Sequence, residues 1–165
     1  MVDESNDGSR PATIEDLKRV LRALNENEVE YLLIGGYAIA AQGYIRATTD
    51  IDILVPATVE TGERVKRALL ILPRQVSEEI DTEWFKDGDT IRVADEFVVD
   101  IMFNACGETY QSLVSELEVL EIDGIPVRTV SVEGLLRTKQ TVREKDVLDR
   151  IVLERAIEKM KGRKP

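Results

Sequence analysis

The most informative absence in the sequence is histidine, because the 165 residues contain none. A chain without histidine cannot form a Ser-His-Asp or Cys-His catalytic set of its own, and it is poorly suited to binding zinc. The single cysteine, Cys106, excludes a disulfide within the chain and agrees with a reducing compartment. Any catalysis must therefore depend on other side chains.

Basic residues and long apolar runs are also scarce. Lys and Arg number 22 against 32 Asp and Glu, which gives a formal net charge of -10. This balance disfavours a general binder of polyanions, because phosphate contacts need concentrated Lys and Arg, but it leaves room for a local basic site. No apolar run approaches the ~20 residues of a membrane-spanning helix, and the polar start "MVDESNDGSRP" is unlike a signal peptide. We therefore expect a cytoplasmic protein that does not enter a membrane.

The composition and the apolar patterning predict a single α/β domain. Hydrophobic residues make up 43% of the chain and charged residues 33%, as in ordinary globular domains. We expect residues 1–12 to form a disordered N-terminal segment and residues 13–162 to form the domain. Apolar residues at helical spacing predict the longer helices, at 13–24, 58–71 and 144–161. In the last of these, the positions expected to pack on the sheet are Val147, Leu148, Ile151, Val152 and Ala156.

Apolar segments of strand length predict a small β-sheet. They lie at 29–35, 49–55, 90–93 and 97–103. Asp123-Gly124, flanked by alternating apolar residues, predicts a further hairpin nearer the C-terminus. Because hairpins join some of the strands, we expect a mixed sheet flanked by helices, followed by a C-terminal hairpin and helices. This is an α/β or, more strictly, an α+β architecture.

The segment "TTDIDILV" places two aspartates inside an apolar strand. Residues two apart in a strand point to the same side, so Asp50 and Asp52 present both carboxylates on one face. Such a pair repels itself unless a cation lies nearby, and carboxylate oxygens suit Mg²⁺. Alternatively, the aspartates end the strand and face water. A third acid, Asp100, lies inside the apolar strand "FVVDIMF", and one metal site would account for all three.

Gly35-Gly36 follows the first predicted strand and precedes a short helix of small residues. Glycines let a backbone approach a phosphate closely, and the N–H groups at a helix start favour an anion. A tight turn explains the same glycines without any ligand. Lys139 and Arg143 are four residues apart and would share one side of a helix, either at such a site or on a solvated surface.

Gly35-Gly36, the run "RATTDIDILV" and the later strand aspartate together resemble the nucleotidyltransferases of the DNA polymerase β superfamily. "IGGYAIAAQGYIRATTDIDILV", followed by "EIDGIPVRTVSVEGLLRTK" and "REKDVLDR", is similar to the AbiEii-type branch of bacterial nucleotidyltransferase-like proteins, often found in toxin–antitoxin or phage-defence loci. The resemblance spans about residues 14–157. It implies a nucleotidyltransferase fold and Mg²⁺-dependent transfer of a nucleoside monophosphate from an NTP to an acceptor hydroxyl.

The resemblance also implies roles for individual positions. Asp50, Asp52 and Asp100 would be catalytic and bind a pair of Mg²⁺ ions, with Mn²⁺ as an alternative. Asp52 would bridge the two ions, and Asp100 would serve as the base for the attacking hydroxyl. Gly35 and Gly36 would hold the triphosphate, whose charge the catalytic residue Lys139 would stabilise. The other expected nucleotide-binding residues are Arg46, Thr49 and Asp146.

The acceptor implied by the resemblance is an RNA such as tRNA, a partner protein, or a small molecule. A tRNA acceptor would need a basic track beside the acids, and a small one is available in Arg46, Arg137, Lys139, Arg143 and Lys145. A co-encoded toxin or antitoxin is a further expected partner. The alternative function is a catalytically inactive nucleotide-binding or antitoxin module of the same fold. Such modules usually lose one or more acids, and all three are present in this chain.

Overall fold

A computed structural model describes residues 8–44, 47–141 and 143–162. At its centre is a four-stranded sheet in the order β1-β2-β4-β3. The strands are β1 (Leu32–Ile34), β2 (Ile51–Leu54), β3 (Ile91–Ala94) and β4 (Val98–Met102). β2 and β4 run parallel, whereas the other neighbours run antiparallel, so the sheet is mixed, as the sequence predicts.

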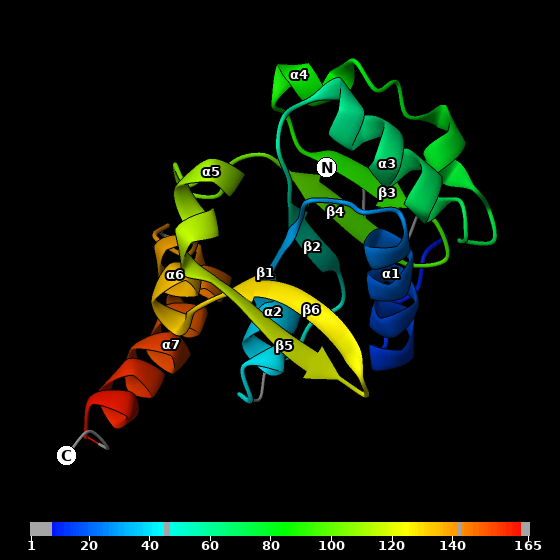
Figure 1. Cartoon of the computed structure of the whole chain (residues 1–165). Helices are drawn as coiled ribbons and strands as arrows, with labels where there is room; N and C mark the ends of the chain where they lie inside the picture. Colours follow the sequence, from blue (N-terminus) through cyan, green and yellow to red (C-terminus); the bar gives the residue numbers. More distant parts are fainter. Residues whose placement is uncertain (1–7, 45–46, 142, 163–165) are drawn as a thin grey trace.

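Two pairs of helices lie at opposite sides of the sheet (Figure 1). α1 (Ile14–Glu26) packs beside α3 (Val59–Leu69), and α6 (Val132–Arg137) packs beside α7 (Glu144–Gly162). The shorter elements are α2 (Gly35–Ala41), α4 (Trp84–Asp87), α5 (Tyr110–Leu113) and the 3-10 turns η2 (Val76–Glu79) and η3 (Val114–Glu116). The three predicted longer helices correspond to α1, α3 and α7, and their presence is confirmed.

α1 is a capped amphipathic helix. Thr13 Oγ1 accepts a hydrogen bond from the Asp16 N–H, and the Asp16 carboxylate accepts one from the Thr13 N–H at 2.8 Å. These two bonds satisfy backbone N–H groups that the first turn leaves without a helical partner. The face turned to the core carries Leu17, Val20, Leu21 and Leu24, all fully buried.

β5 (Leu117–Ile122) and β6 (Ile125–Val130) form the predicted hairpin, as a separate two-stranded sheet. Asp123 and Gly124 have φ values of 49° and 80°, and a tight two-residue turn requires positive φ at both positions. The hairpin is attached to the main sheet through β1, because Thr129 Oγ1 donates a 2.8 Å hydrogen bond to the Leu33 carbonyl.

The first strand is shorter than the sequence predicts. The expected strand covers 29–35, whereas β1 has only three residues. Gly35 has φ of +74° and already belongs to α2, so the extended backbone ends at Ile34. The chain therefore turns directly from strand to helix at the first glycine.

Part of the predicted N-terminal segment belongs to the fold. Residues 1–7 lie outside the described residues. Residues 8–12 are described, and they contact the domain: the Ala12 N–H donates to the Thr49 carbonyl at 2.9 Å, and Arg10 forms an ion pair with Asp16. Ala12 is also buried, so this stretch contributes to the core.

The inward face of α7 matches the prediction only in part: Ala156 is buried and Val152 packs against the core, as expected. Leu148 and Ile151, expected to pack on the sheet, are 58% and 41% exposed. The buried positions are Asp146, Asp149, Leu153 and Ala156, and the helix packs against α6. The two aspartates turn inward because they pair with a buried lysine that the next subsection describes. Among the described helices, none combines the length and apolar character that crossing a bilayer requires.

Candidate active site

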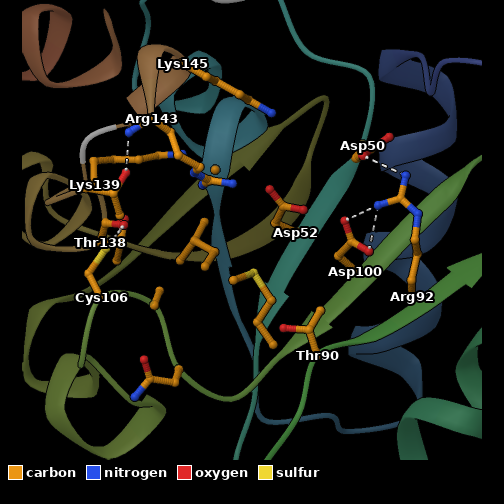
Figure 2. Close-up of a pocket in the computed structure, with 16 residues that line it drawn as sticks. Asp50, Asp52, Thr90, Arg92, Asp100, Cys106, Thr138, Lys139, Arg143 and Lys145 are labelled. Carbon is orange, nitrogen blue, oxygen red and sulfur yellow. Dashed lines mark hydrogen bonds and ion pairs between the residues drawn. The ribbon is translucent and has the colours of Figure 1, made fainter. Parts of the chain in front are cut away.

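A cavity of about 460 Å³ opens beside β2 and β4 and is bounded on its other side by Thr138, Lys139, Thr141 and Arg143 (Figure 2). Its volume lies in the range of small-molecule binding sites, which is about 300–1,000 Å³. The acidic side chains that line it are Asp50, Asp52 and Asp100, and the basic ones are Arg92, Lys139, Arg143 and Lys145. The three aspartates, together with Arg92, form an acidic wall of the cavity. Lys139, Arg143 and Lys145 form a basic wall opposite it.

The three aspartates reach this cavity because of strand register. Asp52 in β2 is paired directly with Asp100 in the parallel strand β4. Neighbouring strands lie about 4.8 Å apart, so side chains of paired residues on one face are close neighbours. Asp50 is two residues before Asp52, which places it on the same side, and Figure 2 shows all three carboxylates on one side of the cavity.

Arg92 completes the acidic wall from the next strand. In the antiparallel pair β3–β4, Arg92 lies opposite Asp100. Its Nη1 lies 3.2 Å from Asp100 Oδ2, and its Nη2 lies 3.4 Å from Asp50 Oδ2. One guanidinium therefore connects two of the three carboxylates (Figure 2).

The Asp52 carboxyl is desolvated by its surroundings. Burial and the neighbouring Asp100 raise the pKa of Asp52 to about 7, although the charges of Lys139 and Lys145 act to lower it. A raised pKa means that the carboxylate is poorly compensated in its surroundings. A bound cation would supply the missing compensation.

The two glycines make room for side chains of this site. A Cβ on Gly35 would lie 2.3 Å from Asp52 Oδ2, and Gly35 also has φ of +74°. A Cβ on Gly36 would lie 2.6 Å from the Thr48 Cβ. Close packing against Asp52 and Thr48 is thus a reason for the glycine pair that does not depend on a phosphate.

The basic wall is held by α7. Lys139 Nζ lies 3.3 Å from Asp146 Oδ1 and 3.1 Å from Asp149 Oδ2, and all three side chains are buried. Burial acts to raise the pKa of Asp146, but hydrogen bonds from Thr141 and Arg143 and the charge of Lys139 lower it below its usual value. The lysine is therefore a charged and fixed part of the wall.

Arg143 and Lys145 are the accessible cations of this wall. The Arg143 side chain is 70% exposed while its guanidinium lies 2.9 Å from Asp146 Oδ2, and Lys145 is exposed. In Figure 2 both point toward the cavity from the side opposite the aspartates. Both side chains are therefore accessible to an anion in the cavity.

Comparison with known proteins bears on the fold. No protein-family model matches the chain, and no curated protein matches its sequence. Among solved structures, it is similar to a Thermotoga maritima protein provisionally named a nucleotidyltransferase, with 17% sequence identity, 92% of this chain and 93% of that one covered, and a TM-score of 0.58. The fold is nucleotidyltransferase-like. The predicted fold class, a small mixed sheet with flanking helices, is thereby confirmed.

Within this nucleotidyltransferase-like fold, the acidic wall has the right donors for Mg²⁺ but is not closed around an ion. Carboxylate oxygens are the ligands that Mg²⁺ prefers in proteins. As the side chains stand, no three Asp, Glu or Cys residues in the described ranges 8–44, 47–141 and 143–162 are grouped so that they could hold a metal. Two of the acids, Asp50 and Asp100, form ion pairs with Arg92 instead.

The structure brings together some of the predicted site residues and separates others. Those that line the cavity are Gly35, Asp50, Asp52, Asp100 and Lys139. Three others do not line it: Gly36, Thr49 and Asp146. Gly36 packs on Thr48, and Thr49 donates a hydrogen bond to Asp50. Asp146 accepts a hydrogen bond from Lys139. Arg46 lies outside the described residues.

Two contributors to the site are absent from the sequence prediction. The role of Arg92 could have been predicted from the sequence. The tight turn at 95–97 sets the register of the hairpin, and this register places the charged residue of "TIRV" opposite Asp100. The role of Asp149 could not have been predicted, because an aspartate on a helix with apolar residues on several faces gives no sign of which face is buried.

Proposed function

We propose that the protein is a metal-dependent nucleotidyltransferase, which transfers a nucleoside monophosphate from an NTP to an acceptor hydroxyl. The observation that carries the proposal is the placement of three aspartates across one cavity from Lys139, Arg143 and Lys145: Asp52 in β2, Asp100 in β4, and Asp50 just before β2. Acids that attract divalent cations and bases that attract phosphates are the two parts that phosphoryl transfer requires.

Asp50, Asp52 and Asp100 would hold a pair of Mg²⁺ ions, or Mn²⁺ in their place. Bound there, the ions would neutralise charge on the phosphates and on the reacting oxygens. Two features support the donor set: the raised pKa of Asp52, which indicates an uncompensated carboxyl, and the pairing of Asp52 with Asp100 on parallel strands.

The remaining steps belong to side chains of this chain. The acceptor oxygen would bond to the α-phosphorus as the bond from that phosphorus to the oxygen bridging the β-phosphate breaks, so pyrophosphate leaves. Asp100 would accept the proton of the acceptor hydroxyl. Arg143 and Lys145 would contact the departing phosphates. Lys139, which is held by Asp146, would stabilise the negative charge of these phosphates. This is catalysis by positioning and electrostatics, and it needs no histidine.

The acceptor belongs to one of three classes: an RNA such as tRNA, a partner protein, or a small molecule. The accessible cations at the cavity, Arg143 and Lys145, form only a small basic patch on a chain of net charge -10. A long RNA contact would require more cations than these. Following the resemblance of its motifs, we also place the protein in a toxin–antitoxin or phage-defence system, with a co-encoded partner.

The test is transfer of label from each of the four α-labelled NTPs in the presence of Mg²⁺ and a cell extract, followed by RNase or protease treatment. Asp52→Asn should abolish labelling of the acceptor. Asp87→Asn, which removes an exposed carboxylate on α4, is the matched control and should leave labelling unchanged. Equal labelling by Asp52→Asn and the wild type would refute the proposal.

A second candidate function is a nucleotide-binding module that no longer catalyses transfer. The observation that favours it is the bridging of Asp50 and Asp100 by Arg92, which leaves the acids ungrouped for a metal. Calorimetry with ATP, CTP, GTP and UTP in the presence of Mg²⁺ separates the two: binding of a nucleotide without any transfer supports the module.

A further inference from the structure

Arg92 occupies a defined place in the row of charges that crosses the sheet. Strand pairing aligns Arg92 in β3 with Asp100 in β4, and Asp100 with Asp52 in β2. β3 is the edge strand of the sheet, so the guanidinium reaches the acids from the outer side (Figure 2). The register of the three strands therefore places the arginine next to the acids.

The guanidinium takes the carboxylate oxygens that a divalent cation would use. It contacts Oδ2 of Asp50 at 3.4 Å and Oδ2 of Asp100 at 3.2 Å. Its planar fork of N–H donors bridges two carboxylates readily. A cation and the arginine therefore compete for these oxygens, and their like charges repel each other at this distance.

The two contacts of Arg92 with the acids are long for ion pairs. Charge-assisted hydrogen bonds between nitrogen and oxygen are typically about 2.7–2.9 Å, and both Arg92 contacts are longer. The Arg92 side chain is also 37% exposed, so solvent reaches it.

We propose that Arg92 is an internal counter-ion that holds Asp50 and Asp100 in the metal-free protein and competes with the divalent cation for them. The inference rests on the proposed function, because that function supplies the cation. Its consequence is that Arg92 sets the metal affinity of the site: the cation binds weakly while Arg92 holds the carboxylates and more tightly when the arginine is removed.

The test is Mn²⁺ binding to the metal-free protein without nucleotide, measured from the spin-resonance signal of free Mn²⁺. We expect Arg92→Gln to lower the Kd for Mn²⁺ at least about tenfold, because the Oδ2 atoms of Asp50 and Asp100 become available and a nearby positive charge is lost. Arg92→Lys should give an intermediate Kd, since an ammonium keeps the charge but lacks the bridging fork.

Arg19 offers a matched control. It also lies between two acids, Asp16 and Glu96, its side chain is 38% exposed, and its replacement by Gln changes the net charge equally. Arg19→Gln should bind Mn²⁺ as the wild type does, within about twofold. An Arg92→Gln protein with unchanged or weaker Mn²⁺ affinity overturns the inference, as does Arg19→Gln tightening binding to the same extent. If Arg92→Gln does not fold, Arg92→Lys with wild-type affinity overturns it.

The outcomes separate this inference from the proposed function. Tighter Mn²⁺ binding by Arg92→Gln, together with no nucleotide transfer by the wild type, supports the counter-ion and refutes the enzyme. Nucleotide transfer by the wild type, together with equal Mn²⁺ affinities, supports the enzyme and refutes the counter-ion.

Discussion

Lys139 Nζ lies 3.1 Å from Asp149 Oδ2, and both side chains are buried. A second buried carboxylate, Asp146, lies 3.3 Å from the same nitrogen. These contacts fix α7 against the segment that follows α6, and Arg150 strengthens the junction by donating to the carbonyls of Lys139 and Thr141. The basic wall of the cavity is thus built on buried charge.

Removing the lysine should therefore destabilise the whole protein. Lys139→Met leaves two buried carboxylates without their ammonium, and breaking a buried pair in this way typically costs about 3–5 kcal/mol. The free energy of unfolding, from urea denaturation, should fall by that order. Lys159→Met, on the exposed end of α7, is the control and should change it by less than about 0.5 kcal/mol. An equal, small effect of both substitutions would contradict the structural role.

The sequence predicted the parts of this fold that local patterns determine. The turn at Asp123-Gly124 and the apolar strands around Asp52 and Asp100 depend on neighbouring residues, and the structure has a hairpin and strands at these places. The inward face of α7 depends on a lysine outside the helix, so periodicity alone placed Leu148 inside when it is exposed. Patterns within one segment do not record such partners.

The same limit applies to the site. Two aspartates two residues apart indicate a shared face, but the involvement of Arg92 follows only from the pairing of three strands. The glycine pair was interpreted through its backbone, whereas the structure shows the steric demand of Asp52 and Thr48. Contacts between strands join residues that are far apart in the sequence, and they determine which charged side chains lie next to one another.

Asp52 should make the stability of the metal-free protein fall as pH rises. Its pKa is raised from 3.8 to about 7 in the fold, so between these values the folded state holds a proton that the unfolded state has lost. Stability contributed by the neutral carboxyl is present below pH 4 and is lost progressively up to about pH 7. Asp52→Asn should therefore raise the melting temperature at pH 8 and have little effect at pH 4.

Asp16 provides a contrast of opposite sign in the same experiment. The hydrogen bond from Arg10 lowers the pKa of Asp16 to about 2, so its charged form stabilises the fold above pH 4, and this contribution is lost as pH falls toward 2. Asp16→Asn should lower the melting temperature at pH 8. If both variants respond to pH in the same direction, the electrostatic account of Asp52 is wrong.

Gly35→Ala should disturb the site as well as the fold. The new Cβ would lie 2.3 Å from Asp52 Oδ2, so that side chain must move. Gly43 is the matched control: its φ of +96° strains an alanine too, but a Cβ there meets nothing within 4 Å. Both variants should lose stability, by about 1–2 kcal/mol from backbone strain. Only Gly35→Ala should also weaken Mn²⁺ and nucleotide binding, measured by calorimetry.

Cys106 gives chemical access to the cavity from the wall opposite Arg92. The thiol lines the cavity, is exposed, and contacts the Thr138 carbonyl at 3.2 Å, next to Lys139. An adduct such as N-ethylmaleimide would fill space that a nucleotide needs and would separate the loop at Cys106 from Thr138. We expect alkylation to weaken nucleotide binding at least about tenfold in calorimetry, and bound nucleotide with Mg²⁺ to slow the alkylation. Cys106→Ser, treated with the same reagent, should bind nucleotide as the untreated wild type does. Full nucleotide affinity in the alkylated wild-type protein would mean that the ligand does not use this cavity.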